Sequence, residues 1–185
     1  MNHIIKVLIL FLLFWSCKES ETKIEPEAVK TYEANWESLA EHKADPEWFH
    51  DSKLGIYFHW GLYSVPAYGS EWYPYRLYRE NEYPDYKEFH EKNYGKLEDF
   101  GYHDFIPMFK AEKFDAENWA ELFKTAGAKF AGPVAQHHDG FAMWDSEINP
   151  WNAADMGPKK DITGEILTAI KKRGLKTMTS FHHAR

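Results

Sequence analysis

The chain has 185 residues, a formal net charge of −7 at pH 7, and hydrophobic and aromatic contents of 44% and 17%. This apolar content is enough for the core of one domain of ordinary size, and the acidic balance excludes a basic surface of the kind that binds nucleic acid. Cys17 is the only cysteine, so an internal disulfide is excluded as well.

The first 17 residues have the pattern of an export signal. Lys6 is followed by an uninterrupted apolar run from Val7 to Trp15, which is too short to span a bilayer. Ser16 and Cys17, with the polar residues after them, resemble the cleavage and lipidation site of a bacterial lipoprotein. We expect Cys17 to be the lipid-modified first residue of an exported protein, in the periplasm or on the outer membrane or cell surface of a bacterium. The alternatives are an ordinary signal peptide and a short anchor.

Residues 18–45 are predicted to form a polar tether that ends in a short helix. The tether is rich in Glu and Lys and cannot bury enough apolar surface to fold. Residues 32–43 predict a short amphipathic helix, because three apolar residues recur at helical spacing: Trp36, Leu39 and Ala40. The folded domain is predicted to occupy residues 46–185.

Three short apolar runs in this domain predict buried strands at residues 54–58, 129–135 and 176–181. Each run is bounded by glycine or polar residues, as is typical of strands in the core of a sheet. Each run is also followed by histidine within two residues. Polar groups at the carboxyl ends of such strands are where α/β proteins place their sites.

Two helices are clearly marked between these strands. Asp115 is expected to cap the first, which ends at Gly127; the second begins at Asp161 or Thr163 and ends at Gly174. The apolar faces expected to be buried comprise Trp119, Leu122, Phe123 and Ala126 in the first helix, and Ile166, Leu167 and Ile170 in the second.

A long aromatic segment, residues 61–108, separates the first strand from the first of these helices. It has little periodicity, and one helix is expected within it at Tyr86–Tyr94. A connection of this length in a compact domain is usually functional or has structure of its own. Glu71 and Trp72 lie in this segment, where a glutamate beside a tryptophan is on its own most often a surface feature.

The order strand, helix, strand, helix, strand predicts a parallel sheet with helices packed outside it. Because no glycine-rich phosphate loop follows any strand, a (β/α)-barrel of TIM type is favoured over a nucleotide-binding sheet. Only the first strands and helices of such a barrel are present, so we expect an incomplete one. The carboxyl ends of the strands should bring five histidines to one face: His59, His137, His138, His182 and His183.

Histidines clustered in this way suit two chemistries, metal binding and hydrogen bonding to sugar hydroxyls. A single histidine in the core would more often be a structural group. The adjacent pairs lack recognisable metal-ligand spacing, and only one histidine of each pair should face the pocket if strand geometry continues. We therefore predict no metal, and keep a metal-dependent hydrolase that uses these histidines as the alternative.

Three stretches carry a resemblance to a known family. They read GIYFHWGLYSVPAYGSEWY, FDAENWAELFKTAGAKFAGPVAQHHDGFAMWDS and GPKKDITGEI. They resemble the N-terminal part of the catalytic domain of glycoside hydrolase family 29, the α-L-fucosidases, over residues 46–185. HWG, SEWY and HHDGF occur here in the order typical of that family.

This resemblance implies a (β/α)-barrel hydrolase that removes terminal α-L-fucose from glycans by a retaining mechanism, without a cofactor. It implies that five residues line the fucose pocket: His59, Glu71, Trp72, His137 and His138. Imidazoles and a carboxylate are suited to hold vicinal hydroxyls, and an indole ring to cover the methyl-bearing edge of the sugar. Fucosylated glycans or glycosides are therefore the expected substrates, and membrane contact is expected only through Cys17.

The family pattern places no catalytic residue within this chain. A retaining glycosidase needs two carboxyl groups about 5 Å apart, and the resemblance puts both the nucleophile and the acid/base beyond Arg185. We therefore expect this chain alone to be inactive. Gln136 stands where the family often has lysine, and neither His182 nor His183 maps onto the pattern. A lipid-anchored module that binds sugar without cleaving it remains the non-enzymatic alternative.

Overall fold

The computed structural model describes residues 31–42 and 45–182. The predicted export signal, Cys17 and His183 lie outside these residues. The chain divides into two compact units, Met1–Ala44 and Asp45–Arg185, which are described separately. Within the two described ranges, no helix is both long and apolar enough to cross a membrane.

The described part of the first unit contains one short helix, α2 (Trp36–Ala40). Its N-terminus is capped by Asn35, whose side-chain oxygen accepts a 2.8 Å hydrogen bond from the backbone N–H of Ser38. The helix lies within the predicted range, but none of its residues is buried and Trp36 is 84% exposed. A cap and a favourable local sequence are therefore enough to account for this helix.

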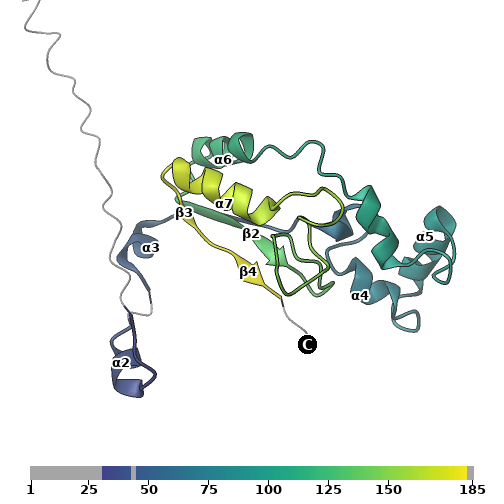
Figure 1. The fold of residues 1–185 in the computed structure, drawn as a ribbon, viewed down its shortest axis with the longest axis horizontal. Coiled ribbons are helices and arrows are strands. Elements are labelled where there is room, and N and C mark those ends of the chain that lie inside the picture. Colours follow the sequence, from purple (N-terminus) through teal and green to yellow (C-terminus); the bar gives the residue numbers. More distant parts are fainter. Residues whose placement is uncertain (1–30, 43–44, 183–185) are drawn as a thin grey trace, which may run out of the picture. The chain divides into compact units, whose positions relative to one another are not determined.

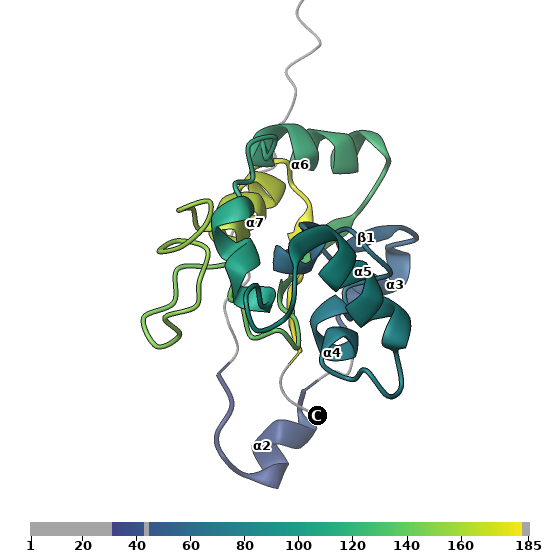
Figure 2. The same ribbon diagram turned by 90° about the vertical axis from the view of Figure 1, so that its right-hand side faces the viewer.

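The second unit is built on a parallel sheet of four strands (Figures 1 and 2). The strands are β1 (Gly55–Phe58), β2 (Phe130–Gln136), β3 (Lys176–Thr177) and β4 (Ser180–Phe181). Strand β2 pairs with each of the other three, always in parallel, and its five central residues are buried. The predicted α/β class and parallel sheet are confirmed.

The third predicted strand is not continuous, which corrects the expectation of one strand over residues 176–181. Pro133 in β2 has no N–H to donate at the point where the ladder breaks. There the hydroxyl of Thr179 donates to the Pro133 carbonyl at 3.0 Å instead. At Gly132, an added Cβ would lie 1.6 Å from the Met178 carbonyl oxygen. The chain thus leaves the ladder after β3 and rejoins it as β4, with a shift in register.

Helices α6 (Ala116–Thr125) and α7 (Ile162–Lys172) lie side by side along the sheet (Figure 1). Each begins at a predicted cap: Asp115 accepts from the N–H of Asn118 at 2.9 Å, and Asp161 from that of Gly164 at 2.8 Å. In α7 two residues of the expected apolar face, Ile166 and Ile170, are buried, while Leu167 is only partly buried. In α6 the expected face is partly wrong, because Leu122 is 65% exposed and Ala126 is exposed as well.

The buried face of α6 is centred elsewhere on the helix. Ala120 is fully buried, and Trp119 and Phe123 pack against the ring of Phe58 in β1. Leu122 is two positions from Ala120 and therefore points away from that face. The small side chain of Ala120 lets the helix approach, while the large aromatic side chains on either side fill the space above β1.

The long segment after β1 has more structure than its sequence indicates. A helix α3 (Glu47–Asp51) precedes β1, and four further elements lie between β1 and α6. They are η1 (Leu62–Ser64), α4 (Tyr73–Leu77), α5 (Pro84–Tyr94) and η2 (Tyr102–Met108). Only α5 was predicted. Helices α4 and α5 pack together beyond the carboxyl ends of the strands (Figure 1).

A buried histidine, His90, organises the interior of this segment. Its Nε2 lies 2.8 Å from the Phe100 carbonyl oxygen, which can only accept, so Nε2 carries the proton. Its Nδ1 therefore accepts from the Tyr73 hydroxyl, also at 2.8 Å. Both nitrogens are satisfied, so His90 can be completely buried.

Candidate functional site

The five side chains predicted to bind substrate meet beyond the carboxyl ends of β1 and β2. The imidazole centroids of His59 and His137 are 5.5 Å apart. Nitrogen or carboxylate atoms of His59, Glu71 and His137 all lie within 4.8 Å of one another. Trp72 lies 5.1 Å from His137 and stacks on His138 at 4.7 Å, with 26° between the ring planes. Segments far apart in the sequence thus form one cluster.

Both histidines of the pair at the end of β2 belong to this cluster, so the expectation that only one would face the pocket is wrong. The strand ends at Gln136, and residues 137–140 form a turn in which the N–H of Gly140 donates to the His137 carbonyl at 3.1 Å. Gly140 has φ 76°, a conformation that suits glycine. Because the turn ends the alternation of the strand, the rings of His137 and His138 lie 4.9 Å apart.

His182, which the sequence could not assign, is a member of the same cluster. Its ring centroid lies 4.9 Å from His137, 5.4 Å from His138 and 5.7 Å from His59. Its position is set by β4, since its N–H donates to the Gln136 carbonyl at 2.9 Å. The only signal for His182 in the sequence was its place directly after a predicted strand.

His137 is the centre of the cluster and differs from every other histidine that the structure describes. It is 2% exposed, and neither Nδ1 nor Nε2 has a hydrogen-bond partner within the described chain. Such an unsatisfied buried group costs about 1–3 kcal/mol. A ligand that supplies hydrogen bonds or a metal–nitrogen bond would remove this cost.

Asp139 fastens the turn that carries the histidine pair. Its Oδ2 accepts from the Tyr102 hydroxyl at 2.8 Å, and its Oδ1 accepts from the Phe141 N–H at 3.2 Å. Tyr102 belongs to η2, so this contact ties the end of β2 to the long segment. The sequence placed Asp139 in the right region but gave no sign of this partner.

The sequence of this chain matches the family model described as alpha-L-fucosidase over residues 20–185. The chain belongs to the alpha-L-fucosidase family. It is 41% identical over 170 residues to the tissue alpha-L-fucosidase of Homo sapiens. The aligned residues make up 91% of this chain and 35% of that relative. It is 43% identical over 143 residues to the human plasma alpha-L-fucosidase, covering 77% and 30% of the two chains.

Solved fucosidases share the fold. Two crystal structures of the Thermotoga maritima alpha-fucosidase, one of them in complex with fucose, match with a TM-score of 0.76 and 39% identity. The match covers 83% of this chain and 38% of theirs. The chain therefore corresponds to part of the fucosidase barrel, and it spans about a third of the length of the curated relatives that it matches.

Two imidazoles of the cluster, those of His59 and His137, have lowered pKa values. Burial, reinforced by His182, His138 and His59, lowers the pKa of His137 to about 4. Burial also lowers the pKa of His59, although the carboxylate of Glu71 acts in the opposite direction. A neutral imidazole has one donor and one acceptor nitrogen, which suits a hydroxyl that both donates and accepts.

The pKa values of two oxygen groups beside the cluster, the Asp139 carboxyl and the Tyr63 hydroxyl, are raised. Burial raises the pKa of Asp139 to about 6, against the opposing effect of its hydrogen bonds from Tyr102 and the Phe141 N–H. Burial, with Asp139 and Glu71 nearby, raises the pKa of Tyr63, whose ring lies 5.6 Å from that of His137. The hydroxyl of Tyr63, which lies in η1, therefore stays protonated beside the cluster.

Two hollows lie near the strand ends. A smaller one of about 330 Å³ opens beside the histidine cluster. It is lined by His59, Tyr63, Ser64, Ala67, Tyr68, Gly69, Ser70 and Glu71. This volume is at the lower end of the range of about 300–1,000 Å³ typical of small-molecule sites, as suits a single sugar ring.

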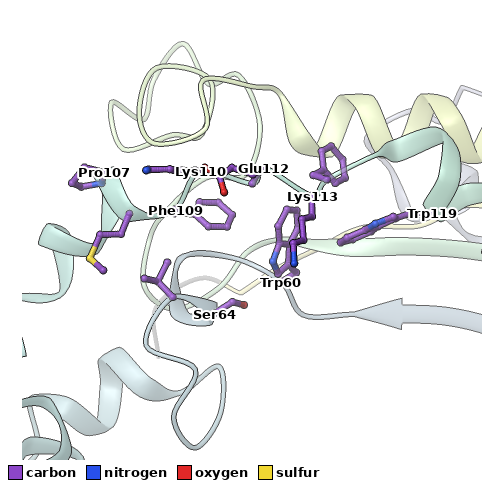
Figure 3. A pocket seen from close by; sticks show the side chains of 12 residues that line it. Trp60, Ser64, Pro107, Phe109, Lys110, Glu112, Lys113 and Trp119 are labelled. Carbon is purple, nitrogen blue, oxygen red and sulfur yellow. The ribbon is translucent and has the colours of Figure 1, made fainter. Parts of the chain in front are cut away.

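The larger hollow, about 760 Å³, is a groove that contains no predicted site residue. Figure 3 shows Trp60, Phe109 and Trp119 along it, with Lys110, Glu112 and Lys113 at its rim. The ring of Trp60 packs against those of Phe109 and Trp119 at 5.3 and 5.1 Å. By size alone this groove would be the candidate ligand site. The unpaired nitrogens of His137 instead favour the histidine cluster as that site.

Proposed function

We propose that this chain carries the fucose-binding part of an α-L-fucosidase that acts on terminal α-L-fucose of glycans. The observation that carries the proposal is the buried His137, whose two unpartnered nitrogens lie within a cluster of His59, Glu71, Trp72 and His138. Membership of the fucosidase family, and a solved relative in complex with fucose, support the choice of sugar.

The chemistry of the cluster fits a deoxy-sugar. The neutral imidazoles of His59 and His137 and the carboxylate of Glu71 are arranged to bind neighbouring hydroxyls, whose hydrogen bonds would replace those that His137 lacks. Trp72 supplies the apolar surface for the methyl-bearing edge of the ring. Specificity then arises from pairing each buried polar group while leaving one edge of the sugar against a ring.

We propose a retaining mechanism in which both carboxyl groups of the reaction come from residues C-terminal to 185. Of the carboxylates beside the cluster, Asp139 is engaged by Tyr102 and the Phe141 N–H, and Glu71 is assigned to hydroxyl binding. Neither is therefore free to form the pair, about 5 Å apart, that retention requires. In this proposal the described residues bind and orient the sugar, and later strands carry out bond cleavage.

The test separates binding from turnover. The 185-residue chain is expected to bind L-fucose in saturation-transfer NMR but to release no nitrophenol from a nitrophenyl α-L-fucoside. A chain that continues through the remaining strands should do both. Absence of L-fucose binding by either chain would contradict the assignment of the pocket. Turnover by the 185-residue chain would contradict the placement of the carboxyl pair.

A metal-dependent hydrolase is the second candidate, because two groups of potential ligands share His137. They are His137, His138 and His182, and His59, Glu71 and His137, with donor atoms within 4.8 Å in each group. A catalytic metal site normally has ligand histidines oriented by carboxylates or carbonyls, and His137 has no such partner among the residues described. Hydrolysis that is lost on chelation and restored by zinc would favour this candidate.

We also propose that the protein is exported and lipidated at Cys17. The basis is the sequence alone: a short apolar run that ends in Ser16 and Cys17. Expression in a bacterium fed labelled palmitate should label the wild-type protein and not Cys17→Ala. Labelling of both proteins would contradict lipidation at this residue, while retention of both in the cytoplasm would contradict export.

A further inference from the structure

Three of the histidines lie close enough together to share one ligand. The rings of His137, His138 and His182 are 4.9 to 5.4 Å apart, and one nitrogen from each lies within 4.8 Å of the other two. They come from the end of β2, the turn after it, and the end of β4. Three imidazoles are a known zinc ligand set.

We propose that His137, His138 and His182 bind a single Zn²⁺ reversibly, and that the ion and the sugar exclude each other. The zinc half stands on the three imidazoles alone. The exclusion half rests on the proposed fucose site, because His137 and His138 belong to both sets. A nitrogen bonded to zinc has no lone pair left to accept a hydrogen bond from a sugar hydroxyl.

The nitrogens are available for such an ion. His137 is almost fully buried, and both its nitrogens lack a partner among the described residues. The Nε2 of His182 lies 3.1 Å from the Tyr57 hydroxyl, so Nδ1 is the nitrogen that this contact leaves available to an ion. Tetrahedral zinc with bonds of about 2.1 Å needs nitrogens about 3.4 Å apart, and these nitrogens, all within 4.8 Å of one another, can reach that spacing through small side-chain rotations.

The same features indicate a reversible ligand rather than a resident cofactor. Second-shell hydrogen bonds typically raise metal affinity 10- to 100-fold. Among the described residues only His182 has one: when its Nδ1 binds the ion, its Nε2–H donates to the hydroxyl oxygen of Tyr57, and no described carboxylate holds the ring of His137. The ion should therefore leave on dialysis against a chelator, and its main effect should be to block the sugar.

The test uses the 185-residue chain and zinc chloride in isothermal titration calorimetry. We expect one ion per chain, and Co²⁺ in its place should give the visible absorption of a tetrahedral site. His182→Gln should weaken zinc binding by roughly tenfold or more, and its L-fucose affinity is measured beside its zinc affinity. His103→Ala, which removes an exposed histidine outside the cluster, should change neither. Far-UV circular dichroism establishes that each variant is folded, and His138→Gln provides a second ligand variant.

The outcomes separate the two halves of the proposal. Zinc affinity that is unchanged in both His182→Gln and His138→Gln would overturn the zinc site. Zinc binding that depends on these residues, together with L-fucose binding that zinc does not weaken, would overturn the exclusion. Zinc binding that depends on His182, in a chain that binds no L-fucose, would support the metal site and overturn the proposed function.

Discussion

The surroundings of His90 and His137 differ in one respect, although both histidines are buried beneath aromatic rings. His90 is 0% exposed and has both nitrogens paired, with the Tyr73 hydroxyl and the Phe100 carbonyl. His137 is 2% exposed and has neither nitrogen paired among the described residues. The two side chains are therefore equally buried, but the nitrogens of His90 are hydrogen-bonded and those of His137 are not.

The difference separates a structural histidine from a ligand-binding one. A buried polar group that is fully paired stabilises the fold, and one that is unpaired destabilises it unless a ligand completes it. Around His90 the chain supplies its own partners from α4 and from the segment before η2. Around His137 the described residues supply three more imidazoles and a carboxylate but no hydrogen bond, as expected of a group that a bound ligand completes.

The largest expected effect tests this contrast directly with the same substitution at both positions. His90→Phe should lower the free energy of unfolding by about 2–4 kcal/mol, because it leaves the Tyr73 hydroxyl and the Phe100 carbonyl buried without partners. His137→Phe should leave it unchanged or raise it by up to about 1–3 kcal/mol, because no hydrogen bond is lost and two unpaired nitrogens are removed. Urea denaturation measures both values. An equal loss in the two variants would break the comparison.

The reverse order is expected for sugar binding. His137→Phe should weaken L-fucose binding by roughly tenfold or more, since at least one hydrogen bond to the buried imidazole is lost. His90→Asn, measured where the variant is still folded, should leave the affinity nearly unchanged. Calorimetry or saturation-transfer NMR provides the measurement. Retention of full affinity by His137→Phe would remove this residue from the site.

A smaller effect is expected for the apolar side of the site. Trp72→Ala should weaken L-fucose binding by roughly five- to tenfold through loss of ring contact. It should also reduce the preference for L-fucose over L-galactose, which carries a hydroxyl on the carbon that is a methyl group in fucose. Trp151→Ala, which removes a part-exposed indole outside the cluster, is the matched control. An unchanged preference in Trp72→Ala would contradict its assigned role.

A further effect is a change in the pH dependence of stability, in which the contributions of two groups oppose each other. The pKa of His137 is about 4 in the folded chain against 6.5 for a free imidazole, so its contribution falls as pH drops from 6.5 to 4. The pKa of Asp139 is raised from 3.8 to about 6, so its contribution rises as pH drops from 6 to 4. The two effects oppose each other in the wild type.

Asp139→Asn removes one side of this balance. Its urea midpoint should fall more steeply than that of the wild type between pH 6.5 and pH 4, because the loss from His137 is no longer offset. His137→Phe should show the opposite change, a midpoint that holds or rises as pH drops. Parallel midpoint curves for Asp139→Asn and the wild type would contradict the raised pKa of Asp139.

The sequence predicted the framework well because local signals determine it. Asp115 and Asp161 cap their helices as expected, and the apolar runs of β1 and β2 pair in parallel. These elements depend on interactions within a few residues or on a strong apolar pattern. The buried face of α6 was partly mistaken, since Ala120 was overlooked and Leu122 was assigned to the core.

The site was predictable in its members but not in its geometry. The motifs indicated His59, Glu71 and Trp72, but nothing local shows that a turn after β2 brings both His137 and His138 into one cluster. The place of His182 depends on where the chain rejoins β2, which is a tertiary property. The elements within residues 61–108 were mostly missed because packing of aromatic rings, rather than periodicity, specifies them.

The close approach at Gly132 has a consequence for any mutational survey of this protein. The carbonyl of Met178 occupies the space that a side chain on residue 132 would need, and the bend it permits sets the path that leads to His182. A screen scored only by binding of L-fucose should therefore find position 132 as intolerant as the pocket itself, even toward alanine. A tolerance map would then mark as essential a residue that never contacts the substrate, and the reason would be one missing methyl group.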